Sequence, residues 1–215
     1  MSLKEILLSL IAIIIVVVVP HSGIIPIPFG YAIPVLVFTW FFLRRKKESF
    51  ETIGFTFKRF GSKSVFIGIL SGILLFSFLT WVFFPLLEKI VELPPANLGD
   101  FAKIKGNTGF YVFLLAMSWI IGGFYEELVF HGFIFTRLEK VIAGNYASLV
   151  SFLLTNIIFA VYHWQLGLFG VINALIAGMF YHSLMLYYKR NMWYAIFCHA
   201  IYDTIALTYM YVGYG

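Results

Sequence analysis

The sequence predicts an all-α fold, a polytopic bundle of transmembrane helices, from its composition and from the spacing of its apolar residues. Of the 215 residues, 61% are apolar and 12% are charged, and the mean hydropathy is +0.94. Soluble domains are about half apolar and a quarter charged. The apolar residues form long runs, and a membrane-spanning helix needs roughly 20 of them. The composition excludes a disordered chain, and the single cysteine, Cys198, excludes a disulfide scaffold.

Seven apolar runs are the predicted spans, and six or eight spans are also compatible with the pattern. In chain order they cover about 6–19, 29–43, 65–87, 110–135, 146–162, 168–188 and 193–212. No small-x-small cleavage site follows the first run, so a retained anchor is favoured over a secretory signal. The polar segment 88–107 contains Pro94-Pro95, which blocks a continuous helix, and we expect this segment to lie along the membrane surface.

The basic residues predict the orientation of the bundle. With the N-terminus inside, only Lys89, Lys103 and Lys105 of the 15 basic residues fall outside the cell. The cytoplasmic set consists of Lys4, Arg44, Arg45, Lys46, Lys47, Lys58, Arg59, Lys63, Arg137, Lys140, Lys189 and Arg190. Cytoplasmic loops carry such an excess of Lys and Arg. Membrane topology therefore accounts for the net charge of +5, and we expect a multi-pass protein of the cell membrane with no nucleic-acid partner.

Ionisable residues inside the apolar runs indicate a functional site. They are Glu126, Glu127, His131, His163, His182, His199 and Asp203. Each ionised group at membrane depth costs a few kcal/mol, and such groups usually face the bundle interior and mark a functional path. The alternative is a set of hydrogen bonds that hold helices together. Two adjacent glutamates with histidines on three helices favour a site, whereas His182 has no partner at helical spacing and is assigned to packing. His21 falls in a short loop and is expected to contact solvent.

Spacing places several of these residues on common helix faces. Residues four apart share a face, as in the pairs Glu127 and His131, Phe159 and His163, and His199 and Asp203. Asn156, seven residues before His163, lies on the same face as that histidine. Counted from the cytoplasmic charges, the depth of Asn156 in the membrane matches the depths of Glu126 and His199 better than the depth of His163 does. Glu126 points about 100° away from Glu127 on an α-helix. Three helices can therefore direct polar groups at one pocket.

Hydrolysis is the chemistry that best suits two carboxylates and several imidazoles in a dry pocket. A glutamate in a low dielectric can take a proton from water. Imidazoles can donate hydrogen bonds to an oxyanion or bind a metal. A zinc protease of the His-Glu-x-x-His type is excluded because no His-Glu pair occurs. The membrane serines Ser118 and Ser183 lack the context of a nucleophile elbow.

Three motifs in order resemble the CPBP family, also called Abi, of CAAX prenyl endopeptidases and bacteriocin-processing or immunity proteins. The family pattern is Glu-Glu-x-x-x-Arg, Phe-x-x-x-His and His-x-x-x-Asn or Asp. Here the motifs begin at Glu126, Phe159 and His199, and the resemblance covers about Trp119 to Asp203. We expect residues 1–108 to supply N-terminal spans and the surface segment, and 109–215 to form the family-like core of one membrane domain.

The resemblance implies roles for individual residues. Glu126 would activate the attacking water, His163 would hold the water, and His199 with Asp203 would bind the scissile carbonyl. Glu127, His131 and Asn156 would support them. Alternatively, Glu126, His163 and His199 would bind a divalent metal such as zinc and Glu127 would be the base. The metal-free scheme is slightly favoured, because no ligand pair has the spacing of zinc proteases.

One position departs from the family pattern, since His131 stands where the family has Arg. An Arg could pair permanently with Glu127, whereas a His carries charge only when protonated. Either this pair is pH-sensitive, or the motif has drifted. The leading prediction is an intramembrane endopeptidase that cleaves a membrane-associated or lipidated, CAAX-like peptide, or a bacteriocin or pheromone precursor, by glutamate-activated water. The alternative is a non-catalytic membrane protein for bacteriocin self-immunity or interaction.

Overall fold

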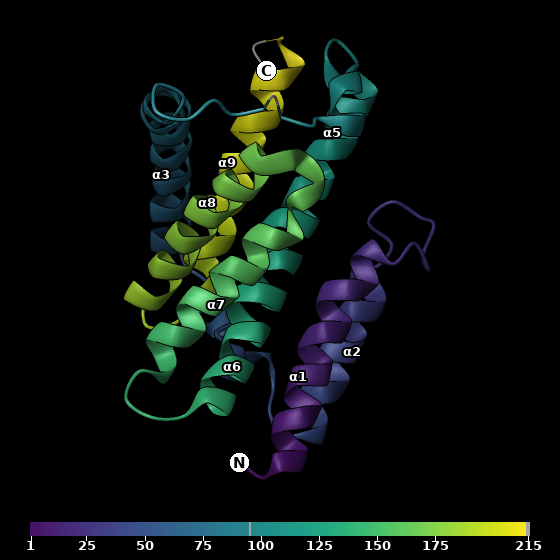
Figure 1. Ribbon diagram of the computed structural model, residues 1–215, viewed down its shortest axis with the longest axis vertical. Coiled ribbons are helices and arrows are strands. Elements are labelled where there is room, and N and C mark those ends of the chain that lie inside the picture. Colours follow the sequence, from purple (N-terminus) through teal and green to yellow (C-terminus); the bar gives the residue numbers. More distant parts are fainter. Residues whose placement is uncertain (95, 214–215) are drawn as a thin grey trace.

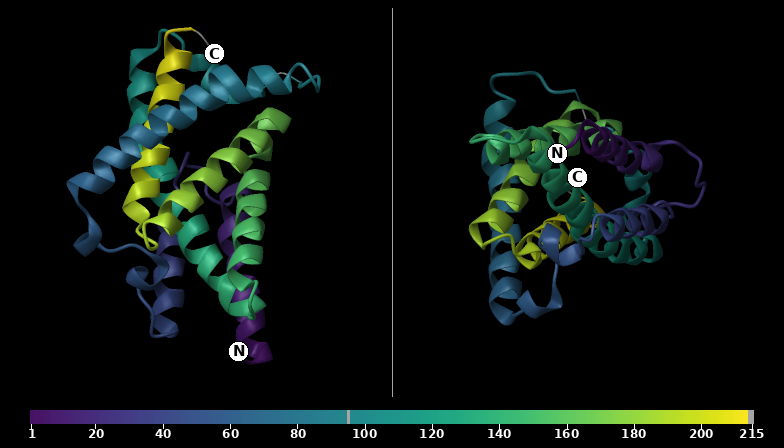
Figure 2. Two further views of the ribbon diagram at one scale, coloured as in Figure 1. Left: turned by 90° about the vertical axis from the view of Figure 1, so that its left-hand side faces the viewer. Right: turned by 90° about the horizontal axis from the view of Figure 1, so that it is seen from below.

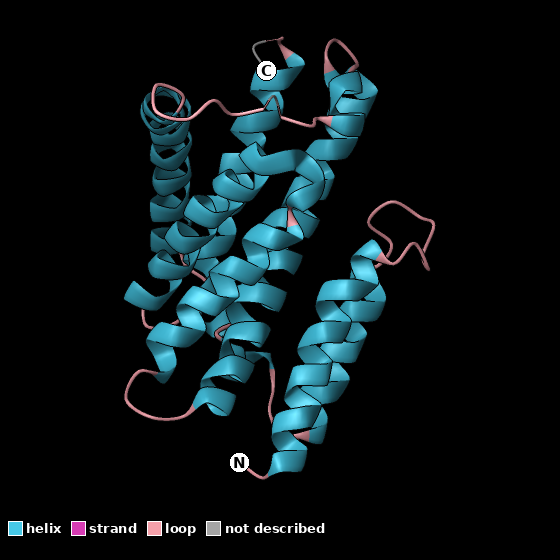
Figure 3. Ribbon diagram, viewed as in Figure 1, coloured by secondary structure: helices cyan, strands magenta, loops and turns pink. Residues whose placement is uncertain are grey.

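The fold is an all-α bundle in which long helices cross one another at varied angles (Figure 1). The computed structural model describes residues 1–94 and 96–213, apart from the side chain of Asp100. Pro95, the second proline of the predicted helix break, therefore lies outside the described residues. No strand occurs in the part of the chain that is described (Figure 3).

The helices of the described residues join into seven rods. The first three are α1 (Leu3–Val18) with η1 (Val19–His21), α2 (Ala32–Arg45), and α3 (Ser62–Phe78) with η4 (Leu79–Phe83) and α4 (Phe84–Leu87). The others are α5 (Thr108–Met117) with η6 (Ser118–Ile134) and α6 (Phe135–Ile142), then α7 (Ala147–Tyr162), α8 (Gly167–Tyr187) and α9 (Met192–Tyr211). Short 3₁₀ turns connect them: η2 (Phe50–Ile53), η3 (Phe57–Arg59), η5 (Gly99–Ile104) and η7 (Trp164–Leu166).

Four helical stretches are long and apolar enough to cross a bilayer, so the chain is a multi-pass membrane protein. They are Leu3–His21, Ser62–Leu87, Thr108–Ile142 and Trp164–Tyr187. Each of the seven predicted runs contains a helix, with ends that differ by a few residues because polar caps such as Ser62-Lys63 extend the helices beyond the apolar residues. The segment after α4 crosses between helix ends, and its described residues form the short η5 (Figure 2).

α9 is the central helix and packs against α3, η6 and α8. Glycines allow the backbones to approach closely. A Cβ at Gly72 of α3 would lie 2.6 Å from the carbonyl oxygen of Cys198, and a Cβ at Gly123 of η6 would lie 2.8 Å from the Cβ of Ala200. Helices in membranes associate through such small residues, which permit close van der Waals packing. Cys198 is fully buried in this contact.

Charged side chains gather at the end of the bundle that carries the N-terminus, hereafter the basic end. Arg137 and Lys140 of α6 both pair with Glu48, which follows α2. Arg190 forms two hydrogen bonds with Glu139. The remaining contacts at this end join Lys46 to Glu5 over 3.3 Å, Arg59 to the carbonyl of Lys189, and Asn191 to the carbonyl of Arg59. The basic clusters that are far apart in sequence thus meet at one end of the bundle.

Candidate active site

A cavity of about 970 Å³ brings the predicted catalytic residues together. Glu126 on η6, His163 after α7, and His199 and Asp203 on α9 all contribute to its lining. Its other walls are largely apolar and come from η1, α3, η4, α4, α5, α8 and the segments before α2 and α5. The sequence therefore predicted which residues converge, while their chemical roles stay predictions.

The helix that carries both glutamates is π-helical from Ser118 to Ile134. π-Helical turns close i→i+5 hydrogen bonds and are rare, and they occur frequently at functional sites. The α-helical angle expected between Glu126 and Glu127 does not apply to this wider turn. Even so, the two side chains point to different surroundings, since Glu126 lines the cavity and Glu127 is completely buried behind it.

His163 reaches Glu126 because α7 ends there. The backbone N–H of His163 donates to the carbonyls of Ala160 and Val161. It does not donate to the carbonyl of Phe159, as it would in a continuing α-helix, so that carbonyl is available to another donor. Nδ1 of His163 donates a hydrogen bond of 2.8 Å to that carbonyl. The ring is thereby oriented with Nε2 facing Oε2 of Glu126 at 3.7 Å. This separation is too long for a direct hydrogen bond, but both atoms can contact one small reactant between them.

Glu127 links the first motif to the third. Its Oε1 accepts a hydrogen bond of 2.8 Å from Nδ1 of His199, and its Oε2 accepts one of 2.8 Å from Nδ1 of His131. The carboxylate is completely inaccessible, so it has no free oxygen directed at the cavity. Buried charges are stable only when they are paired and hydrogen-bonded, and both oxygens of Glu127 satisfy this condition.

His199 is held between two carboxylates and an aromatic ring. Its Nδ1 donates to Glu127, and its Nε2 faces Oδ2 of Asp203 at 3.6 Å. The ring stacks on Tyr181 with centroids 4.4 Å apart. Gly122 provides the space for this arrangement, because a Cβ there would collide with Oδ2 of Asp203 and lie 3.4 Å from Nε2 of His199. The Nε2 atom of His199 therefore points toward the cavity in a fixed orientation.

A second buried polar cluster lies behind Glu127. His131 and His182 place their ring centroids 4.9 Å apart, and Asn156 donates from Nδ2 to Nδ1 of His182 over 3.1 Å. All three residues are fully buried and none lines the cavity. Asn156 was expected to lie in the site, but it does not line the cavity. Because α7 ends at Tyr162, the residue after it, His163, lies at the cavity beside Glu126. His182 does have partners, but they lie on other helices and no spacing within α8 indicates them.

His21 was expected to contact solvent, and it is exposed in the structure, but it also contacts the end of α7. Its Nε2 donates to the carbonyl of Tyr162 over 3.0 Å, its ring packs edge-on against Tyr162, and it lines the cavity. The end of α7 lacks further helical turns to use that carbonyl, so a side chain from the 20–31 loop can bind it. No sequence pattern relates these two distant segments.

The proposed metal ligands do not fit a metal site in this arrangement. Among the described residues, no group of three His, Cys, Asp or Glu side chains is arranged to hold a metal ion. Both ring nitrogens of His199 already face carboxylate oxygens of Glu127 and Asp203. Coordination by His199 would therefore require the loss of one of these contacts.

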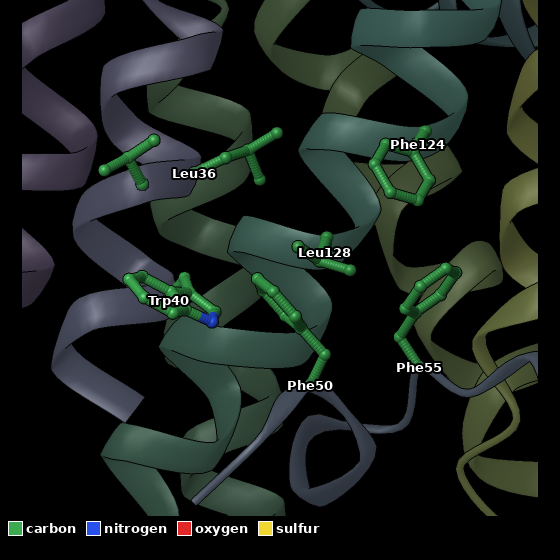
Figure 4. A pocket seen from close by; sticks show the side chains of 7 residues that line it. Leu36, Trp40, Phe50, Phe55, Phe124 and Leu128 are labelled. Carbon is green, nitrogen blue, oxygen red and sulfur yellow. The ribbon is translucent and has the colours of Figure 1, made fainter. Parts of the chain in front are cut away.

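A smaller pocket of about 310 Å³ lies between α2 and η6 and is shown in Figure 4. Its lining consists of apolar and aromatic side chains, with Trp40, Phe50 and Phe55 around Leu128. It contains no titratable group that could act as acid or base, so it is not a candidate for the reaction.

The region with this geometry matches one family model. Residues 108–205 match the type II CAAX prenyl endopeptidase family, Rce1-like. These residues form an Rce1-like domain. The match begins at α5 and ends within α9, so it includes all three motifs, whereas the cavity walls from η1, α3, η4 and α4 lie outside it. No curated protein and no solved structure matches the chain. Membership of the Rce1-like domain in an endopeptidase family implies a protease.

Proposed function

We propose that the protein is an intramembrane endopeptidase that hydrolyses a membrane-associated peptide with water activated by Glu126. The peptide is a lipidated, CAAX-like C-terminus or a bacteriocin or pheromone precursor. The bundle has seven spans with the N-terminus in the cytoplasm, because the basic end gathers most of the Lys and Arg residues. The observation that carries the proposal is that, of the two adjacent glutamates, only Glu126 lines the cavity, 3.7 Å from His163.

Water activation follows from the fixed orientation of His163. Its Nδ1 carries the proton that bonds to Phe159, so Nε2 is available as an acceptor toward the cavity. A water between Nε2 and Oε2 of Glu126 can donate one hydrogen to each. Glu126 takes a proton as the water oxygen bonds to the carbonyl carbon of the scissile amide. General-base catalysis of this kind contributes typically 10²–10⁴-fold.

The same geometry supplies a hydrogen-bond donor for the oxyanion and a proton for the leaving group. His199 faces carboxylates with both nitrogens, so both can carry protons, and its Nε2–H can donate to the oxygen of the tetrahedral intermediate. The C–N bond then breaks, and the proton on Glu126 passes to the departing amine. The products are a carboxylic acid and an amine, and Glu126 returns to its starting state. Glu127 keeps His199 in position and touches no reacting atom.

The test compares Glu126→Gln with the wild type, purified in detergent and assayed with a farnesylated peptide that ends in Cys-a-a-X and with a non-lipidated apolar peptide. We expect cleavage to fall by about 10²–10⁴-fold, with thermal unfolding at an equal or higher temperature, because Gln removes a buried charge that lacks a close ion pair. A chelator is added in a parallel arm and should leave the wild-type rate unchanged.

Three outcomes would contradict the proposal. Full turnover by Glu126→Gln would exclude this residue as the base. Loss of activity with chelator and its recovery with zinc would require metal ligands that the present arrangement does not form. A wild type that cleaves neither peptide, while it still protects its host from a bacteriocin, would favour the immunity function.

A further inference from the structure

The mouth of the catalytic cavity lies away from the basic end. Its lining includes His21 at the end of η1, Phe29 from the loop before α2, Asn97 from the segment before α5, and Leu166 of η7. None of the described lining residues comes from the segments 44–63, 137–147 or 188–192. Those three segments carry most of the basic residues and join in the ion pairs of the basic end.

The floor of the cavity is closed toward the basic end by buried side chains. Phe130 packs edge-on against both Phe159 and Tyr162, with ring centroids 5.2 and 4.8 Å apart. Glu127 and His131 fill the adjacent space and are completely buried. Interiors packed in this way hold few voids larger than a water molecule. A peptide therefore cannot reach Glu126 from the basic end without displacing this layer.

The walls between the mouth and Glu126 select for apolar groups. Phe84 and Phe169 stack in the wall with centroids 4.2 Å apart, and Phe76 and Leu79 lie beside them in the lining. Polar groups gather at the rim, where Asn97 binds the carbonyls of Gln165 and Leu166 through its side chain and backbone. A volume of about 970 Å³ is at the upper end of ligand pockets, which leaves room for several side chains of an extended peptide.

We infer that the cavity receives its substrate from the extracytoplasmic face, opposite the basic end, and that the substrate is an apolar segment of an exported peptide. The inference rests on the proposed function, since it concerns the access route to Glu126. The positive-inside rule assigns the basic end to the cytoplasm, and the mouth is at the other end. The substrate must therefore reach the extracytoplasmic face. Among the substrates proposed above, an exported precursor reaches that face, and a C-terminus in the cytoplasm does not.

The first part of the test determines the side of the mouth. Ala96 lines the cavity rim, and Ser62 is exposed at the start of α3, beside the basic Lys63. Single variants Ala96→Cys and Ser62→Cys are treated in intact spheroplasts with a membrane-impermeant polyethylene glycol maleimide. The native Cys198 is completely buried, so wild type serves as the blank. We expect Ala96→Cys to react from outside and Ser62→Cys to react only after lysis, and the reverse pattern would overturn the inference.

The second part measures cleavage from each side. Sealed vesicles of known orientation receive an apolar peptide with a charged, impermeant tag, and the same peptide is assayed in detergent. We expect cleavage only when the peptide is on the Ala96 side, and loss of cleavage when Ala96→Cys carries the bulky maleimide, whereas labelled Ser62→Cys retains its rate. Cleavage in detergent but only from the Ser62 side would overturn the access route alone. Absence of cleavage in detergent would overturn the proposed function, while the labelling would still determine the side of the mouth.

Discussion

Glu127 and His199 are 72 residues apart in the sequence, yet Nδ1 of His199 lies 2.8 Å from Oε1 of Glu127. This hydrogen bond joins η6 to α9 behind the cavity. It gives the two adjacent glutamates different tasks: Glu127 holds the helices and the imidazole in place, and Glu126 remains available to a reactant. Mutations at the two positions should therefore have separable effects.

Glu127→Gln should unfold more easily than the wild type. Gln removes the charge that pairs with His131 and His199, and breaking a buried pair by changing one partner costs about 3–5 kcal/mol. Thermal unfolding in detergent measures the effect, with Glu126→Gln as the matched control that leaves stability equal or higher. If both variants unfold at the wild-type temperature, Glu127 does not stabilise the bundle in the way its hydrogen bonds indicate.

Gly122→Ala should reduce cleavage strongly. The added methyl would meet Oδ2 of Asp203 and crowd Nε2 of His199, so the two side chains must move apart. Gly109→Ala is the control on the same continuous helix, since its methyl would contact only Oδ1 of Asn107, at 3.8 Å. That change should be neutral or slightly stabilising, because Ala favours helices over Gly by about 1 kcal/mol. Equal cleavage rates for the two variants would contradict the close packing at Gly122.

His131→Arg should change the pH dependence of cleavage. An imidazole forms an ion pair with a carboxylate only while it is protonated, so the pairing of His131 with Glu127 is expected to make wild-type activity depend on pH. The groups that face His131 are Glu127, His182 and Phe159. An Arg keeps its charge at every pH of the assay, so the profile of this variant should lack the contribution of position 131. His131→Asn, which does not titrate here, is the second comparison, and superimposable profiles for all three proteins would exclude His131 as the cause.

Glu48 should make the stability of the bundle depend on pH. Burial raises the pKa of this carboxyl, but its hydrogen bonds with Arg137 and Lys140 and their charges lower it more, so the net pKa lies below its ordinary value. Because the pKa of Glu48 is lower in the folded protein, its ionised carboxylate stabilises the fold at any pH above the pKa that Glu48 has in the unfolded chain. This stabilisation is lost as the pH falls through the lower pKa of the folded state. Glu48→Gln should therefore unfold more easily than wild type at pH 7, and the difference should shrink on acidification. Glu51→Gln, an exposed neighbour, is the control.

The sequence predicts the positions of the helices and the residues around the cavity for a simple physical reason. Apolar runs are required in a bilayer, and every carboxylate or imidazole within them needs a partner. The pairing of Glu127 with His131 follows from spacing alone. The contacts of Glu127 with His199, and of His182 with Asn156, depend on how separate helices cross, and no local pattern encodes that crossing. The π-helical turns of η6 likewise have no signal in its composition, and they change the faces that an α-helix would present.

The early end of α7 at His163 has a consequence for the surrounding lipid. Its 16 residues extend about 24 Å, less than the roughly 30 Å of a bilayer's hydrocarbon core, whereas α5 to α6 form one helix of 35 residues. Leu149, Leu153 and Ile157 on the outer face of α7 are exposed to that lipid. A bilayer adapts to a short apolar helix by thinning, so we expect acyl chains beside the α7–α8 hairpin to be more compressed than those beside α5. We expect this hydrophobic mismatch on one flank of the bundle to bring the membrane surface closer to Glu126, which would make acyl-chain length a determinant of the site's accessibility.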